Sequence, residues 1–143
     1  MSINYRYFKG FGIEVVKCEN SAISYPVHTH ISTFVIGLVL KGEVCLGVGQ
    51  SSFTCGANQI FTVPPDTAHS LSAKAAYTLI SICIDKNLVS DKNLLKERLL
   101  VLMNGIGEIS HLNREKILNK IDLFEALPDK KTKIVALKNY IER

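Results

Sequence analysis

The chain has 143 residues, 47% of them hydrophobic, which excludes a long disordered segment and indicates one domain, or one domain with an appendage. Its formal net charge of +4 comes from residues 86–143, where basic and acidic residues are interspersed, so we expect no nucleic-acid binding by these residues. The longest apolar stretch, Phe34 to Leu40, is too short to span a membrane, and the N-terminal residues contain no signal-peptide core. We therefore expect a cytoplasmic protein with reduced cysteines and no membrane partner.

The first 85 residues are rich in β-branched and aromatic residues, interrupted at short intervals by Gly, Pro or Asn. This pattern predicts short strands over residues 12–18, 34–40, 43–49, 51–54, 59–64, 69–73 and 76–84. Many short strands at this spacing indicate a sandwich or a small barrel. Because residues 34–40 show no polar alternation, we expect them to form a central strand that is covered on both faces.

The second part of the chain has apolar residues at the spacing of helices. A first helix is predicted from a cap at Ser90 to a stop at Gly105, and a second over residues 114–127. A third helical segment reaches the end of the sequence, and its apolar positions are Ile134, Leu137 and Ile141. We therefore divide the chain into a β-barrel at 1–85 and a helical region at 86–143.

Two histidines, His28 and His30, stand one residue apart just before the apolar run. On a strand, residues i and i+2 point to the same face, so the two imidazoles should project together. The third candidate is His69, at the start of another predicted strand, whereas His111 falls in the helical part. Three imidazoles can hold a divalent ion, contact an organic ligand or pack as satisfied interior groups, and all three interpretations stay open.

The histidines and their neighbours resemble the two motifs of the cupin superfamily, which have the forms HxH…E…G and PxGxxH. The matching positions are His28, His30, Gly42, Pro64 and His69. Val35 stands where the first motif has Glu, and Asp66 stands where the second has Gly. Since a valine side chain cannot donate electrons to a metal, this departure favours an organic ligand over a metal, and no cofactor is predicted.

A longer resemblance, over about residues 20–143, is to AraC-type transcription regulators. The order PVHTH, an aliphatic strand ending in KG, and SSFTCGANQIFTVPPDTAHS is similar to the N-terminal part of that family, and ALKNYIER is similar to the helix that opens its DNA-binding part. The resemblance implies a mostly β fold with C-terminal α-helices: a cupin-like double-stranded β-helix (jelly-roll) barrel followed by a helical dimerisation region. It implies a domain that binds a small-molecule effector and passes the signal to a helix-turn-helix DNA-binding domain outside these residues.

The expected effector contacts lie in the barrel and in the N-terminal segment. Inside the barrel we expect them at His28, His30, His69, Val35 and Tyr77. In related regulators the N-terminal segment can fold over the barrel mouth, which makes Arg6, Tyr7 and Phe8 candidates; the alternative is an ordinary first strand. Because imidazole donates and accepts hydrogen bonds, sugars and small acids are the effector classes that fit, and titration near neutrality leaves pH sensing open.

The helical region provides the expected partner surface, a homodimer contact. Its residues are Leu95, Leu99, Leu102, Ile117, Ile121 and Phe124. Such stripes must be buried against the barrel or against a second copy. The alternative functions are a small metal-dependent cupin enzyme of the dioxygenase or isomerase type that uses the three histidines, and a cupin-like interaction module without a ligand. We expect no enzyme, since no acid occupies the motif's ligand position and no P-loop or GxGxxG occurs.

Overall fold

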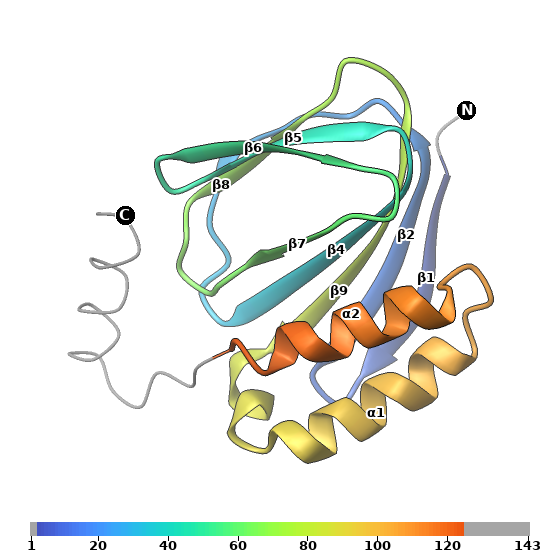
Figure 1. Cartoon of the computed structure of the whole chain (residues 1–143). Coiled ribbons are helices and arrows are strands. Elements are labelled where there is room, and N and C mark those ends of the chain that lie inside the picture. Colours follow the sequence, from blue (N-terminus) through green and yellow to red (C-terminus); the bar gives the residue numbers. More distant parts are fainter. Residues whose placement is uncertain (1–2, 125–143) are drawn as a thin grey trace.

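The computed structural model describes residues 3–124, and in these residues nine strands are followed by one 3-10 helix and two α-helices (Figure 1). The elements are β1 (Ile3–Gly10), β2 (Ile13–Ser21), β3 (Tyr25–His28), β4 (Thr33–Lys41), β5 (Glu43–Val48), β6 (Ser51–Gly56), β7 (Ile60–Val63), β8 (His69–Ser72), β9 (Tyr77–Asp85), η1 (Lys86–Ser90), α1 (Lys92–Asn104) and α2 (His111–Ile121). The strands form two antiparallel sheets with the orders β1-β2-β9-β4-β7 and β3-β8-β5-β6. Every strand predicted above is present, and the mostly β fold with helices after it is confirmed.

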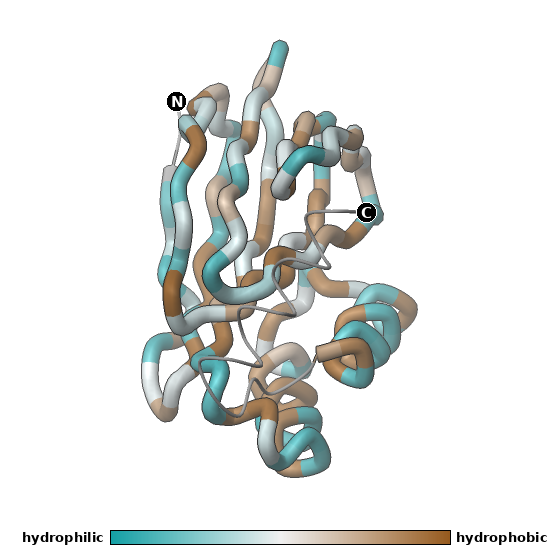
Figure 2. Tube along the Cα trace, turned by 90° about the vertical axis from the view of Figure 1, so that its left-hand side faces the viewer, coloured by the Kyte–Doolittle hydropathy of each residue, from teal (hydrophilic) through white to brown (hydrophobic). Residues whose placement is uncertain are grey.

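The central strand β4 contributes to two hydrophobic cores. Its side chains Ile36 and Leu38 point to the outer face of the five-stranded sheet, where they pack with residues of α1 and α2. Val35 and Val39 point to the opposite face and pack inside the barrel with side chains of the four-stranded sheet. This is the strand that was predicted to be covered on both faces. In Figure 2 both helices alternate between brown and teal along their turns, as expected for helices with one apolar face.

Inside the barrel, the aromatic ring of Phe61 packs directly over Gly37. A Cβ atom at Gly37 would lie 2.1 Å from Cζ of Phe61, so only glycine leaves room for the ring at this point of β4. Phe61 belongs to the inner core, and its strand β7 pairs with β4 so that the two residues lie opposite each other.

The first α-helix begins one residue later than predicted. Its N-cap is Asp91, whose carboxylate accepts a hydrogen bond from the backbone N–H of Leu94 at 3.1 Å, whereas Ser90 ends the 3-10 helix. The predicted stop is confirmed, because Gly105 is the C-cap of α1. No helix of the part of the chain that the structure describes is long and apolar enough to cross a membrane.

The second α-helix begins earlier and ends earlier than predicted. Ser110 caps its N-terminus by accepting a hydrogen bond from the N–H of Asn113 at 3.2 Å, and the helix ends at Ile121 rather than at residue 127. The prediction relied on apolar spacing, which is silent in the polar first turn of the helix. The predicted third segment, with Ile134, Leu137 and Ile141, lies outside the described residues.

The apolar stripe that we expected at a dimer contact packs against the chain's own sheet. Its members are exposed by 5% or less, apart from the partly buried Leu102: Leu95, Leu99, Ile117, Ile121 and Phe124. They pack on the outer face of the five-stranded sheet, and the ring of Phe124 stacks on that of Phe34 with centroids 4.3 Å apart. This corrects the residue assignment: a side chain buried against its own sheet offers no surface to a second copy, and dimerisation itself stays a prediction.

Candidate functional site: a histidine cluster at the barrel mouth

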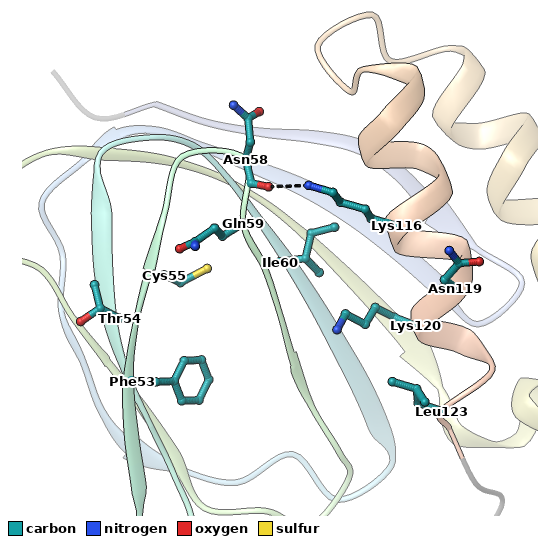
Figure 3. Close-up of a pocket in the computed structure, with 10 residues that line it drawn as sticks. All are labelled: Phe53, Thr54, Cys55, Asn58, Gln59, Ile60, Lys116, Asn119, Lys120 and Leu123. Carbon is teal, nitrogen blue, oxygen red and sulfur yellow. Dashed lines mark hydrogen bonds between the residues drawn. The ribbon is translucent and has the colours of Figure 1, made fainter.

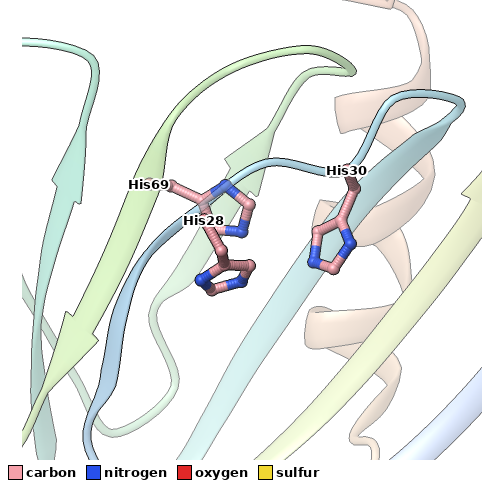
Figure 4. A group of neighbouring side chains, drawn as sticks. All are labelled: His28, His30 and His69. Atoms are coloured by element: carbon pink, nitrogen blue, oxygen red, sulfur yellow. The ribbon is translucent and has the colours of Figure 1, made fainter.

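Three histidines meet at one end of the barrel, which we call the barrel mouth. His28 ends β3 and His69 begins β8, and the pairing of these strands places the two residues opposite each other with ring centroids 4.1 Å apart. His30 lies in the connection before β4 rather than on a strand, yet its ring centroid is 5.0 Å from that of His28 and 5.1 Å from that of His69 (Figure 4). The predicted convergence is therefore present, although the strand periodicity used to predict it does not extend to His30.

A backbone hydrogen bond holds the connection that carries His30. The N–H of Asp66 donates to the carbonyl oxygen of His30 at 2.8 Å. Asp66 has a φ of 56°, in the left-handed region that the glycine of the cupin motif would adopt easily and that aspartate tolerates better than most residues. The replacement of that glycine therefore preserves the turn, and the turn places His30 beside His69.

Two of the imidazoles have a fixed tautomer. Nδ1 of His28 lies 2.7 Å from the carbonyl oxygen of Pro26, and Nδ1 of His69 lies 2.8 Å from that of Thr67. A carbonyl oxygen only accepts, so both Nδ1 atoms must carry a proton, and each ring in its neutral form presents an unprotonated Nε2. Burial lowers the pKa of His69, and burial together with the neighbouring His28 lowers the pKa of His30, which favours the neutral form of both rings.

A cavity of about 430 Å³ adjoins His30 at the ends of β1, β2, β4 and β9. Two carboxylates line it, Glu14 and Asp85. Sequence reasoning missed Glu14, although it alternates with two buried residues of β2, Ile13 and Val15, and strand periodicity alone puts it on the opposite face. Lys9 lines the cavity as well, with its Nζ 3.8 Å from a carboxylate oxygen of Glu14. The mouth therefore combines imidazole nitrogens and carboxylate oxygens, which accept hydrogen bonds, with one ammonium group that is paired with Glu14.

The two remaining candidates inside the barrel, Val35 and Tyr77, belong to the inner core. Val35 pairs with Val63 on β7 and with Cys83 on β9 and is 9% exposed. Tyr77 is 1% exposed, and its hydroxyl donates a hydrogen bond to the carbonyl oxygen of Ile23 at 2.8 Å. The structure thus places both in the apolar filling of the barrel, outside the group formed by the three histidines.

The N-terminal segment forms the edge strand β1, which is the alternative to a lid. The hydroxyl of Tyr7 donates a hydrogen bond to Glu108, in the connection between the helices, at 2.6 Å; burial and this bond raise the pKa of Tyr7 to about 12. Phe8 packs against the core under the helices. Arg6 lies nearest the mouth, since its Nε is 3.7 Å from a carboxylate oxygen of Glu14. Two of the three proposed lid residues therefore face the helices.

The histidine cluster partly fits a divalent metal. Each of His28, His30 and His69 offers one ring nitrogen, and these nitrogens lie within 4.8 Å of one another. Two nitrogens bound to one zinc ion at about 2.1 Å are at most about 4.2 Å apart, so the rings would need only a small inward shift. The hydrogen bonds from Nδ1 to backbone carbonyls are also the outer-shell arrangement of metal-bound histidines. Val35 supplies no anionic ligand, which leaves three neutral donors.

The two-sheet architecture is that of solved cupin domains. The chain is similar to the cupin domain of Schizosaccharomyces pombe Cnp3, with a TM-score of 0.54 and 18% identity over 63% of this chain and 69% of that one. It is also similar to an RmlC-like cupin from Shewanella frigidimarina (TM-score 0.52, 22% identity, 57% and 74% covered) and to the DMSP lyase DddQ from Ruegeria pomeroyi (TM-score 0.50, 14% identity, 58% and 46% covered). These likenesses show the fold.

The sequence identifies the family within that fold. Residues 11–91 match the AraC-like ligand binding domain, so the chain belongs to this family, and the predicted resemblance is confirmed. A comparison with curated proteins gave no match.

Proposed function

We propose that this chain is the ligand-sensing and dimerisation domain of an AraC-type bacterial transcription regulator. A small-molecule effector binds at the barrel mouth, and the barrel passes the signal through the helices to a helix-turn-helix DNA-binding domain outside these 143 residues. The family match over residues 11–91 supports ligand binding. We assign no reaction to the chain, and we place it in the cytoplasm, where a regulator of transcription acts on bacterial DNA.

The fixed tautomers of His28 and His69 carry this proposal. Their Nε2 atoms accept hydrogen bonds, and the carboxylates of Glu14 and Asp85 line the adjoining cavity, where Lys9 is paired with Glu14 at 3.8 Å. Hydrogen-bond acceptors recognise ligands that donate, such as hydroxyl groups. Of the two effector classes expected from the sequence, we therefore favour a sugar or another neutral polyol over a small acid, because an ionised carboxylate has no proton to donate.

A homodimer remains part of the proposal, with its contact on other residues. The outward faces of the helices expose Leu94, Val101 and Leu112, and such large apolar side chains are the ones available to a second copy. Sedimentation that shows a monomer well above micromolar concentration would contradict this part.

The effector class is tested by thermal unfolding in the presence of matched ligands. We expect neutral sugars and polyols to include at least one compound that raises the melting temperature, by an amount equivalent to about 2.7 kcal/mol at a ligand concentration of a hundred times Kd. Carboxylic acids of the same size, such as the aldonic acids of the stabilising sugars, should give a much smaller shift.

Two results would count against the proposal. If saturating concentrations of sugars, polyols and amines all leave the melting temperature unchanged, the sensor function loses its support. If the acids stabilise the protein more than the corresponding sugars, the mouth presents donors, and the assignment of the tautomers is wrong.

The second candidate function is that of a metal-dependent cupin enzyme. The convergence of three ring nitrogens, two of them on rings already oriented by backbone carbonyls, favours it. His28, His30 and His69 would hold the ion, which would act as a Lewis acid when bound. The metal content of the purified protein separates the two candidate functions.

A further inference from the structure

A second cavity, of about 680 Å³, lies between the edge strands β6 and β7 and the C-terminal half of α2 (Figure 3). We call it the α2 groove. Figure 3 shows that strand, turn and helix side chains surround it, with lysines on the helix side and Phe53 on the strand side. Its size is that of a small-molecule site. The groove shares no lining residue with the cavity at the barrel mouth.

The charge of the groove is positive. Lys116 and Lys120 line it from α2, four residues apart and so on one face of the helix, and no carboxylate lines it. Among residues 3–124 neither lysine takes part in a salt bridge; Asp122, the acid nearest to Lys120 in sequence, is bound by Lys96 from α1 at 2.5 Å. Two ammonium groups outweigh the charge of about −0.5 at the C-terminus of a helix.

A side-chain amide adds a further hydrogen-bond donor to the groove. Oε1 of Gln59 accepts from the N–H of Gly56 at 2.7 Å, and Oδ1 of Asn58 accepts from the side-chain amide of Asn113 at 3.1 Å. Because Oε1 of Gln59 is already bonded, its NH₂ group is left to donate. The side-chain amide of Asn58 points away from the other lining residues (Figure 3). The groove therefore presents donors, in contrast to the acceptors of the barrel mouth.

The lining also contains three large apolar side chains, beside the polar Thr54 and Asn119 and the buried Cys55. Phe53 on β6 is 41% exposed and Leu123, after α2, is 72% exposed, with the partly buried Ile60 between the strand and the helix. Nζ of Lys116 donates one long hydrogen bond, to the backbone carbonyl oxygen of Asn58 at 3.5 Å, which leaves its charge uncompensated (Figure 3). Large apolar side chains beside two such ammonium groups favour a ligand that is both apolar and anionic, because its body would remove these side chains from water while its charge meets the lysines.

We propose that the α2 groove binds a small amphipathic carboxylate, with its acidic group at Lys116 and Lys120 and its aliphatic or aromatic body on Phe53, Ile60 and Leu123. The domain would then have two ligand sites of opposite preference: a donating, neutral effector at the barrel mouth and an accepting, anionic ligand at the groove. The second site stands on its own contacts and does not depend on effector binding at the histidines.

The test compares octanoate with the neutral 1-octanol in amide-shift titrations of the whole chain by NMR. We expect octanoate to shift the signals of residues 53–60 and 116–123 and to bind at least about tenfold more tightly than octanol, the difference of a charge-assisted contact. In the double variant Lys116→Gln/Lys120→Gln, the affinity for octanoate should fall to that for octanol.

The control is Lys74→Glu, which changes the net charge by the same two units at an exposed lysine outside the groove. This variant should retain the wild-type affinity within about twofold. The proposal is overturned if octanoate and octanol bind with equal affinity, or if the double variant keeps its affinity for octanoate. It is also overturned if the shifted signals belong only to the barrel mouth, or if no signal shifts at octanoate concentrations up to about 5 mM, since the dissociation constant would then lie above the millimolar range. Thermal unfolding of each variant checks that the fold is retained.

Discussion

Gly37→Ala is expected to lower the free energy of unfolding by about 3 kcal/mol, at the upper end of the cost of overpacking a core. The new Cβ would lie 2.1 to 2.7 Å from three atoms of the Phe61 ring, and that ring is 7% exposed and enclosed by the inner core. The ring cannot turn aside without displacing its neighbours, so either β4 or β7 must move. For a chain of this size the change corresponds to a melting temperature roughly 10 °C lower.

Urea unfolding of Gly37→Ala, of Phe61→Leu and of the double variant measures the coupling between the two positions. Since leucine lacks the ring atoms that meet the new methyl group, the double variant should be more stable than the sum of the single effects predicts. Gly107→Ala is the matched control: no atom lies within 4 Å of a Cβ there, and the change should stay within about 0.5 kcal/mol. Equal stability of Gly37→Ala and the wild type would show that the barrel is not filled as described.

His69→Leu and His28→Leu are expected to lower the affinity for the stabilising polyol about tenfold each, and the double variant should abolish the thermal shift. Each substitution removes one acceptor nitrogen, and a ligand hydroxyl that loses its partner on binding costs about 1 to 3 kcal/mol. Leucine preserves much of the volume of the buried His69 side chain, so the fold should be retained.

The control is His111→Leu, because His111 is exposed on α2 and outside the cluster. Bound metal is quantified on the same samples after removal of any tag. Near-stoichiometric metal in the wild type that disappears in His69→Leu would support the metal-dependent enzyme. If the polyol still raises the melting temperature of the double variant by the wild-type amount, the effector does not bind at His28 and His69.

Much of the fold follows from local patterns. The apolar run of β4 predicted a strand buried on both faces, and the change from period 2 to helical spacing marked the start of the helical region. The four-residue strand β3 contains Pro26, which weakens any strand signal, and the prediction missed it. Helical periodicity shows that a stripe is buried but is silent on what covers it. For this reason the sequence predicts a dimer contact at the stripe of α1 and α2 beside burial against the barrel, and the structure shows burial against the chain's own sheet.

The site could be predicted less well. The motif spacing brought together His28, His30 and His69, but the bonds that fix two of the rings involve backbone carbonyls whose positions no sequence pattern gives. In β1 the register shifts between Arg6 and Phe8, so these residues lie on opposite faces although period 2 would put them on the same face. Phe8 therefore faces the helices, whereas Arg6 lies beside Glu14 at the mouth.

The most direct test of the acceptor-lined mouth is a long-range ¹H–¹⁵N NMR spectrum of the imidazoles at neutral pH. We expect Nδ1 of both His28 and His69 to carry a proton, as their bonds to backbone carbonyls require, and Nε2 of His69 to be unprotonated. Both Nε2 signals should move when the stabilising polyol is added, while those of His111 should not. An unprotonated Nδ1 at either position, or a proton on Nε2 of His69 in the free protein, would contradict the central claim, because the mouth would then offer donors to its ligand.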